Sequence, residues 1–484
     1  MKNKGSITVF LCLCMIVCIG VTGVMLETAR MYGCQSVLSM AKQTAAQSIE
    51  AAYNRALWQK YELLAWDGQL ESDRQQTLKE AYQQWLAGEL HPSTYGLYLY
   101  GMSVEDVWLQ QYDTLLDENG RYLLEQMLDA EESRYSVVLL RLLEDTLSFL
   151  PSMSLPELGI SLDKWLERLT IHKLFADEEQ EPVSDYRLHA DCLPSQMLSG
   201  VLQETAVEKA LVCDYILRHC ASYTDHKTEQ LCYEVEYILG GKETDSLNLV
   251  SAARKLIKLR TGINFIQILS EEEMHTAAEL LGTMIATCLT IPEAEELVTF
   301  LVEVGWAYKE AVRDAQDLYQ GRYVALQKEP GEWHIWIHLP KGELSKKKVT
   351  LADLNDMLGE YFKESTTDVD MGHNMQEVEY SSNRTILNCL QDGNWNYECY
   401  LFLLLYLQDN SIQMGRMMDV IQLELSAEYP AFWLPDCCVG FSMGMRTSFR
   451  PVFSAFSGQI GIWAGRRQLT DVVTIRFSDR YVYF

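Results

Sequence analysis

The first feature in the hydrophobic pattern is a run of roughly 20 uncharged residues, long enough to cross the roughly 30 Å hydrocarbon core of a membrane as a helix. The run follows Lys2 and Lys4 and ends before Glu27. It contains only a poor match to the small-residue site at which secretory leaders are cleaved. We therefore predict a permanent anchor over residues 1–26, with residues 7–26 in the lipid bilayer.

The lysines give the leading segment a positive charge, which predicts that this end stays in the cytoplasm. Everything after residue 26 is then extracytoplasmic, and we expect a single-pass protein of the cell membrane. Lys4-Gly5 also has the basic-glycine form at which prepilins are cleaved. Prepilins carry Glu at the fifth position of the mature chain, where this sequence has Phe10. The sequence leaves open whether the bond between Gly5 and Ser6 is cleaved.

The pattern after the anchor is helical, because apolar residues recur at three- and four-residue spacing from Met31 to Ala45. A helix unbroken from residue 6 to residue 66 would be about 90 Å long at 1.5 Å per residue. We predict a membrane-proximal stalk over residues 27–66, with Gly33 as its weak point.

Helical periodicity covers most of the remaining chain, and strand-like alternation appears toward its end. Residues 72–150 and 194–320 predict helices, with a break at Asn119-Gly120, and residues 395–425 predict a return to helix. The acidic stretch 176–191 predicts a linker or exposed loop. Strands are predicted for "RYVALQ" (322–327), "EWHIWIHL" (332–339) and the section from Ala431 to Phe484.

These patterns predict a mainly α fold with a smaller β-containing C-terminal part (α+β). The single N-terminal transmembrane helix is expected to continue as a long helical stalk. The predicted regions are the anchor at 1–26, the stalk at 27–66, a helical region at 67–190, a helical core region at 191–322 and a C-terminal α+β region at 323–484.

Composition narrows the class of partner. The 484 residues are 48% hydrophobic, enough for two or three domains. All 68 acidic residues but only 38 of the 40 basic residues follow the predicted anchor, so the outer part is strongly acidic. Such a surface repels nucleic acid, which we exclude as a partner. Cysteines beyond the anchor are irregularly spaced, and we expect mostly unpaired, buried thiols and no zinc site.

The segment "GFSMG" (440–444) matches the G-x-S-x-G nucleophile motif of α/β-hydrolases. That mechanism needs Ser442 on a strand-to-helix turn and a histidine later in the chain. The last histidine is His373, and strand-like sequence follows the motif. We therefore predict that Ser442 lies in a glycine-flanked turn or bulge and is not catalytic.

Histidines supply the next candidate site. His334 and His338 lie on one face of a strand or helix and, with His373, offer three nitrogen ligands for a metal. Because Trp333, Trp336 and Ile337 flank the first two histidines, we predict a pair of partly buried structural histidines.

Carboxylates supply another candidate. Glu310 and Asp314 share a face of a predicted helix, with Asp317 one turn further on. Close carboxylates can divide general acid and base roles. Arg313 lies three residues from Glu310, so we predict ion pairing on a helix surface instead.

The remaining motifs are weaker. Asp368 and Asp370 have calcium-loop spacing but lack the glycine and the later ligands, so we predict a plain loop. The basic stretch "RKLIKLR" (254–260) predicts a solvated or ion-paired helix face. No glycine-rich phosphate loop is present. We assign no catalytic, cofactor-binding or metal-ligating residue, and no cofactor.

Several stretches carry a resemblance to a known family. They are the opening, from "KGSITVFLCL" to "LETARMYG", then "AAYNRALWQKYELLAWDG", "EVEYILGGKETDSLNL" (234–249), "GWAYKEAVRDAQDLYQGRYVALQKEPGEW" (305–333) and "YLFLLLYLQDNSIQMGRMMDVIQLELS" (400–426). In this order they resemble the uncharacterised bacterial family named domain of unknown function 5702. Members of that family resemble TadE/TadG-like proteins of tight-adherence pilus loci. The resemblance implies an envelope protein of pilus or secretion assembly and no catalytic residue.

We accordingly expect a membrane-anchored extracytoplasmic structural or assembly protein, associated with a tight-adherence-pilus-like or secretion system. Its expected partners are envelope, pilus or secretion proteins and, through residues 7–26, the lipid bilayer. The alternative is a membrane-anchored envelope hydrolase acting on cell-wall polymer or peptide. That enzyme would need a deep cleft on which Glu310 and Asp314, or His334 and His338, converge with strongly perturbed pKa values. In an assembly protein the same residues would be paired and dispersed.

Overall fold

The structure is a computed structural model, and it describes residues 4–67, 74–90, 102–132, 134, 193–197, 205–225, 231–288, 295–329, 331–334, 395–449 and 473–482. These residues belong to two compact units. Unit 1 comprises 1–127, 197–199 and 425–484, and unit 2 comprises 128–196 and 200–424. Unit 2 is therefore inserted, in sequence, between the two main parts of unit 1.

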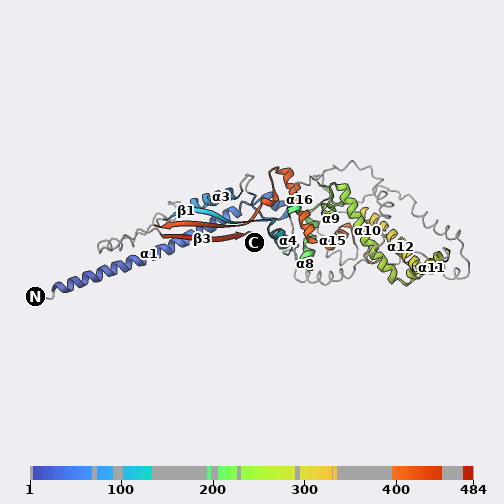
Figure 1. Ribbon diagram of the computed structural model, residues 1–484, viewed down its shortest axis with the longest axis horizontal. Coiled ribbons are helices and arrows are strands. Elements are labelled where there is room, and N and C mark those ends of the chain that lie inside the picture. Colours follow the sequence, from blue (N-terminus) through green and yellow to red (C-terminus); the bar gives the residue numbers. More distant parts are fainter. Residues whose placement is uncertain are drawn as a thin grey trace. The chain divides into compact units, whose positions relative to one another are not determined.

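Unit 1 is built on one long helix and a small sheet (Figure 1). Helix α1 runs from Lys4 to Glu50, and α2 (Arg55–Tyr61) and α3 (Arg74–Glu89) follow it. The sheet is antiparallel in the order β1-β2-β3. Its strands are β1 (Met102–Thr114), β2 (Cys438–Phe449) and β3 (Val473–Val482), with the short 3₁₀ turn η9 (Leu434–Asp436) before β2. The central strand β2 thus joins residues from opposite ends of the chain.

The core of unit 1 lies between one face of this sheet and the helices α1 and α3. Alternate side chains of β2 point to this face because successive residues of a strand face opposite sides. Apolar residues at three- and four-residue spacing on the two helices meet them. The buried members are Leu38, Ala41, Ala45, Ala46 and Ile49 of α1, Leu78, Tyr82 and Leu86 of α3, Trp66, Val107 of β1, and Cys438, Phe441, Met443 and Met445 of β2.

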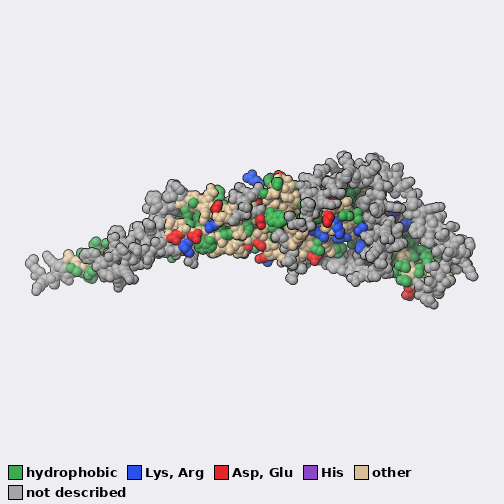
Figure 2. All heavy atoms as spheres, turned by 45° about the horizontal axis from the view of Figure 1, so that its top comes forward, with side chains coloured by type: hydrophobic (Ala, Val, Ile, Leu, Met, Phe, Trp, Pro, Cys, Tyr) green, Lys and Arg blue, Asp and Glu red, His purple; other side chains and the backbone are tan. Residues whose placement is uncertain are grey.

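The N-terminal half of α1 has the opposite character. Its large apolar side chains from Ile7 to Leu26 are 47–67% exposed, and none of the most apolar window is buried in the protein. Figure 2 shows hydrophobic side chains at this end of the helix. By length and composition, this helix is a candidate membrane span, and no other described helix qualifies. The expected continuation into a helical stalk is confirmed as far as Glu50, and the helix passes Gly33 without a break.

A turn separates α1 from α2, so the helix is not continuous to residue 66. Asn54 begins α2 by accepting a hydrogen bond from the Leu57 backbone N–H, as an N-cap residue does. Trp66 then pairs with Cys438 in an isolated bridge at the sheet. The stalk segment therefore ends as part of the folded body of unit 1.

Unit 2 is helical in the part that the structure describes. Its elements are the end of α4 (Asp117–Glu132), the 3₁₀ turn η5 (Pro194–Met197), α8 (Ala206–His219), α9 (Glu234–Gly240), α10 (Asp245–Ser270), α11 (Glu272–Cys288), α12 (Glu295–Tyr319), α15 (Tyr397–Leu407) and most of α16 (Asn410–Glu428). Side-chain caps fix several starts: Thr205 and Glu208 form a capping box on α8, and Thr244 and Asn396 cap α10 and α15. The helix α15 is buried along most of its length.

The predicted fold class is confirmed: a mostly helical protein carries a small antiparallel sheet near its C-terminus and a long apolar N-terminal helix. The helices predicted for residues 194–320 and 395–425 are present. The predicted break at Asn119-Gly120 is present as well, because both residues have positive φ inside α4. The acidic stretch 176–191 lies outside the described residues.

Two local predictions were wrong, and a third is met in part. Residues 102–114, predicted as helix, form β1, which pairs with β2 from the other end of the sequence. Residues 440–444, predicted as a turn or bulge, lie inside the central strand β2 and form no turn, but the pairing with β1 is irregular opposite Ser442 and Met443 and again between Gly440 and Cys438. Gly444 leaves room for the indole of Trp108, since a Cβ atom there would lie 2.4 Å from the ring. The strand predicted at 322–327 is absent, and this segment belongs to the site described next.

Candidate functional site

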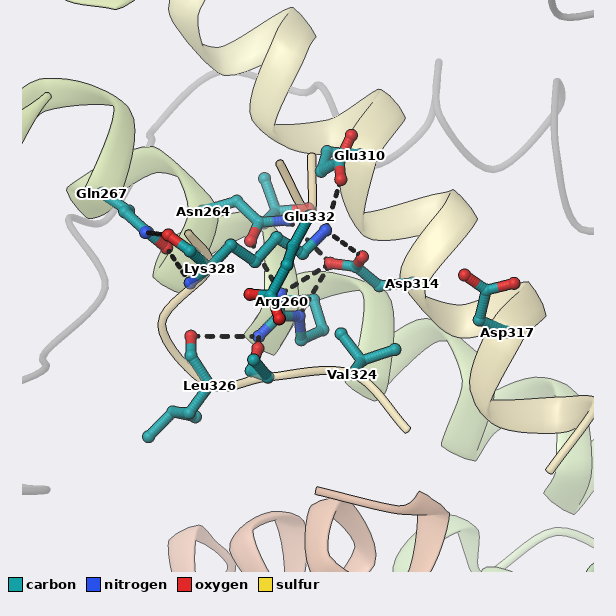
Figure 3. A network of polar contacts seen from close by, with 12 residues as sticks. Arg260, Asn264, Gln267, Glu310, Asp314, Asp317, Val324, Leu326, Lys328 and Glu332 are labelled. Carbon is teal, nitrogen blue, oxygen red and sulfur yellow. Dashed lines mark hydrogen bonds and ion pairs between the residues drawn. The ribbon is translucent and has the colours of Figure 1, made fainter. Parts of the chain in front are cut away.

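The strongest concentration of polar contacts in unit 2 surrounds the ammonium group of Lys328 (Figure 3). We call it the Lys328 network. Two helices, α10 and α12, and the segment 322–334 contribute to it. Its charged members are Arg260 from α10, Glu310 and Asp314 from α12, Lys328, and at its rim Asp317, Arg322 and His334.

The two carboxylates come from one face of α12. Glu310 and Asp314 are one turn apart, so their side chains lie one above the other. That face packs against α10, and both side chains are 0% exposed. Lys328 Nζ contacts Glu310 Oε1 and Asp314 Oδ1, and its own side chain is 2% exposed. A buried charge is tolerated only when it is paired, and here one cation pairs two anions.

Arg260 supplies the second buried cation. Its Nη2 lies 2.7 Å from Asp314 Oδ2, and its Nε donates to the same oxygen at 2.9 Å. Asn264, one turn later on α10, donates to Asp314 Oδ2 at 3.0 Å and accepts from Arg260. The two buried cations therefore balance the two buried carboxylates.

The carbonyl groups of the segment after α12, residues 324–326, are bound by side chains and not by a neighbouring strand. Arg260 Nη1 donates to the carbonyl oxygens of Ala325 and Leu326 at 3.1 and 3.3 Å. The hydroxyl of Tyr400 donates to the Val324 carbonyl at 3.1 Å. These contacts use the backbone groups that a strand ladder would need. The strand predicted for 322–327 is therefore replaced by an irregular, side-chain-bound segment.

A glutamine fixes the backbone of Lys328 itself. Gln267 of α10 donates to the Lys328 carbonyl and accepts from the Lys328 N–H at 3.1 Å. The same amide thus satisfies both backbone groups of the lysine. These two hydrogen bonds fix the backbone of Lys328, which lies in no helix or strand, and so position its ammonium group.

His334 closes the exposed side of the network. Its Nδ1 lies 3.1 Å from Glu310 Oε1, its Nε2 lies 3.1 Å from Asp317 Oδ2, and its side chain is 39% exposed. Hydrogen bonds to Asp317 and Glu310 raise the pKa of His334 to about 9, because they favour the protonated ring. At neutral pH the imidazolium is therefore the third cation of the network.

Glu310 is correspondingly hard to protonate. Burial alone raises the pKa of Glu310, but hydrogen bonds from His334 and the Lys328 ammonium outweigh burial and lower the pKa to about 2. A general acid or base works best with a pKa near the operating pH. Glu310 stays ionised and fully paired at neutral pH, so it lacks the properties of a proton-transfer group.

Glu310, Asp314 and His334 also satisfy the geometry of a metal site, since one ligand atom from each lies within 4.8 Å of the others. The Lys328 ammonium group contacts both carboxylates of this set. Those oxygens are therefore already bound to a cation of the protein itself. The donor set does not fit a divalent ion unless Lys328 first moves away.

A second buried acid titrates nearer neutrality. Glu236 of α9 is 0% exposed and accepts hydrogen bonds from the Tyr397 hydroxyl at 2.8 Å and the Tyr223 N–H at 3.0 Å. Burial raises the pKa of Glu236 to about 7. Rings of Tyr223, Tyr319 and Tyr397 pack together beside it, with centroids 4.9–6.3 Å apart. Since the carboxyl group has no exposed surface, it has no access to a substrate.

The structure brings together some of the residues that the sequence singled out. Glu310, Asp314 and His334 come together in space, as the hydrolase alternative required. They surround the side chains of Lys328 and Arg260, however, and not a cleft. The predicted surface pairing of Glu310 with Arg313 is wrong, because Glu310 is buried and pairs with Lys328 and His334. His338, His373, Asp368 and Asp370 lie outside the described residues.

Ser442 lies in β2, opposite Gln111 of β1 and Arg480 of β3. Its hydroxyl donates to Gln110 Oε1 at 3.3 Å. The position inside a paired strand gives it none of the strand-to-helix geometry that a nucleophile elbow needs.

Sequence reasoning missed Arg260, Asn264 and Lys328. The first two carried a signal: they continue the three- and four-residue spacing of the buried residues Ala253 and Leu256 on α10. A charged residue at an apolar position of a helix predicts a buried partner. In the basic stretch 254–260, Arg254 and Lys258 are exposed and only Arg260 is buried. Lys328 carried no local signal.

Comparison with known proteins assigns a family and no activity. A model described as a family of unknown function, DUF5702, matches residues 163–449, more than half of the chain. The match includes the Lys328 network and the three later stretches that resembled this family, and it excludes α1. No curated protein and no solved structure matches the chain.

Proposed function

The chain belongs to a protein family of unknown function, DUF5702, and from that premise we propose that it is a membrane-anchored structural or assembly protein of the bacterial cell envelope. In this proposal residues 7–26 lie in the lipid bilayer. The two units lie outside the cytoplasm and bind other envelope proteins.

The observation that carries the proposal is that the two halves of α1 differ in the exposure of their apolar side chains. In the first half the large apolar side chains are 47–67% exposed, and in the second half those from Leu38 to Ile49 are buried in the core of unit 1. Exposed apolar surface of this extent has no stable place in water. A membrane would cover the first half, and the second half would join the bilayer directly to the core of unit 1.

Charge supports the proposed orientation. Lys2 and Lys4 precede the apolar segment and no acidic residue occurs before Glu27, which favours an N-terminus in the cytoplasm. Cysteine chemistry agrees with an outer location for the body. Cys399 is disulfide-bonded, and disulfides persist in oxidising compartments. Nine other cysteines are thiols that take no part in a disulfide.

The Lys328 network supports a structural over a catalytic role. Its carboxylates are buried and paired with cations, which are properties of an interior ion cluster that fixes one arrangement of α10, α12 and the segment 322–334. The envelope hydrolase would instead need one of these groups to exchange protons with a substrate.

We further propose that the partners are components of a tight-adherence-pilus-like or secretion system. This part rests on the resemblance of the opening segment to TadE/TadG-like proteins and on a membrane helix that continues outward. Phe10, in place of the glutamate of prepilins, favours a fixed scaffold over a subunit of the fibre.

The first test is topology. Full-length protein carrying alkaline phosphatase at its C-terminus, an enzyme active only outside the cytoplasm, is expected to resist carbonate extraction from membranes and to show phosphatase activity. The variant Lys2→Glu/Lys4→Glu should lose much of that activity, whereas Lys242→Glu, an exposed lysine of unit 2, should not. Soluble protein, or an inactive phosphatase on intact chains, would overturn the proposal.

N-terminal sequencing of protein from the membrane fraction then separates the assembly roles. A chain that begins at Met1 supports an unprocessed scaffold. A chain that begins at Ser6 shows prepilin-like processing. A start beyond residue 23 means a secreted protein and refutes the anchor.

A further inference from the structure

The outward face of α1 beyond the apolar segment carries no charge. Six exposed positions recur at three- and four-residue spacing and form one straight stripe, which we call the α1 stripe: Ala29, Tyr32, Ser36, Met40, Gln43 and Gln47. The other exposed positions, Thr28, Ser39 and Thr44, are uncharged as well. At 1.5 Å per residue this stripe is about 27 Å long. Tyr32 and Met40 are 69% and 64% exposed, more than any other large apolar side chains described outside the apolar segment.

The charged side chains of the same stretch face inward. Glu27, Arg30 and Lys42 are at most 9% exposed, and Glu27 and Arg30 form an ion pair along the helix. In the usual amphipathic helix charges face water and apolar residues face the protein. Here the apolar residues from Leu38 to Ile49 face the core as usual, but the charged residues are buried as well, so only uncharged residues are exposed. An exposed helix face without charged residues is also unusual in a chain with 68 acidic and 40 basic residues. A face from which charge is excluded is suited to contact with another protein surface.

The position of the stripe limits what can cover it. Because α1 is one continuous helix, the stripe runs without interruption into the exposed apolar residues Ile7 to Leu26 (Figure 1). A partner along this line must itself continue from the bilayer into the aqueous region as an uncharged helix. Among the described elements of this chain, α1 alone has that character.

We propose that the α1 stripe binds the α1 stripe of a second copy of this chain, as two parallel helices that rise together from the membrane. The proposal rests on the membrane anchoring proposed above. Anchoring already gives both copies the same orientation, which is the orientation a parallel pair needs. Each copy is strongly acidic, and the uncharged stripe is where two copies can meet without opposing their charges.

The test is photo-crosslinking of full-length protein in membranes. Benzoylphenylalanine replaces Tyr32 on the stripe or, as a matched control, Tyr429, which is 40% exposed on the same unit. Two copies with different affinity tags are co-expressed, so that a product carrying both tags contains two copies. We expect such a product from position 32, with peptides of α1 joined in the mass spectrum, and none from position 429.

A charge on the stripe provides a second readout. Met40→Glu places like charges opposite each other in the pair and should lower the yield from position 32 about tenfold or more. Leu247→Glu adds the same charge at an exposed apolar position of unit 2 and should leave the yield unchanged.

Each other outcome overturns the inference. An adduct of position 32 with a different protein identifies another occupant of the stripe. Absence of any adduct, in protein that resists carbonate extraction, refutes self-association and leaves the membrane anchor standing. Recovery of the protein in the soluble fraction refutes both the inference and the proposed function.

Discussion

Replacing Lys328 by methionine tests whether the Lys328 network holds unit 2 together. The substitution keeps the length and apolar stem of the side chain and removes the ammonium group that contacts Glu310 and Asp314. Both carboxylates are 0% exposed, so water cannot replace the lost partner without opening the structure. The buried cluster then has one more negative than positive charge.

The size of the effect follows from which contacts remain. Breaking a buried ion pair by removing one partner costs about 3–5 kcal/mol. Arg260 still pairs with Asp314, and His334 still contacts Glu310, so we expect the lower end, about 3 kcal/mol. Unit 2 has about 290 residues, so an unfolding entropy of about 2.1 cal/mol/K per residue converts this loss into a fall in Tm of roughly 5 °C.

Thermal and urea unfolding of the full-length protein in detergent, followed by far-UV circular dichroism, measures this loss. The matched control is Lys258→Met, an exposed lysine on α10, which should stay within about 0.5 kcal/mol of wild type. The double variant Lys328→Met/Glu310→Gln removes the unpaired negative charge and should recover at least half of the loss. If Lys328→Met matches the control, or if the double variant is less stable than Lys328→Met, the network is not a buried ion cluster and the reasoning fails.

Three further predictions test other parts of the structure. His334 has a folded-state pKa raised from 6.5 to about 9, so its stabilising effect is complete below pH 6.5 and is lost as pH rises toward 9. The Tm difference between wild type and His334→Gln should therefore shrink over that range. A constant difference would contradict the proposed pairing. Gly444→Ala should lower the free energy of unfolding in urea by about 1–3 kcal/mol, because its Cβ would lie 2.4 Å from the Trp108 ring. Gly305→Ala in α12, whose Cβ meets nothing within 4 Å, should raise it by up to about 1 kcal/mol. Equal effects would refute the close approach of Trp108 to Gly444. Peptide mapping under non-reducing conditions should recover Cys399 only in a disulfide-linked peptide, and recovery of an alkylated Cys399 without reduction would remove one argument for an outer location.

Sequence periodicity predicted the helices well because their signals are local. Spacing, caps and breaks such as Asn119-Gly120 occupy a few consecutive residues. The strand β1 was missed for the opposite reason. Its pairing partner lies more than 300 residues away, and no turn residues next to it indicate a hairpin. Only tertiary pairing makes this segment a strand.

The candidate site shows the same limit. One helical turn was enough to place Glu310 and Asp314 on one face, but not to find what faces them. Arg313, a basic residue close in sequence, was the wrong choice because the buried cations come from α10 and from the segment after α12. The segment 322–327 alternates like a strand, yet Arg260 takes up its carbonyl groups. Contacts between distant segments decided both outcomes.

The central position of β2 has a consequence for how the chain is made. The ribosome reaches residue 438 only after more than 300 further residues have followed β1, which takes about 16–65 s at usual rates of synthesis. Unit 2, which lies between them in sequence, has all its residues by 424 and is free to fold first. During that interval the apolar side chains of α1, α3 and β1 that β2 later covers remain exposed. A chain that stops near residue 430 is therefore expected to keep unit 2 and to leave unit 1 with an exposed, aggregation-prone apolar surface.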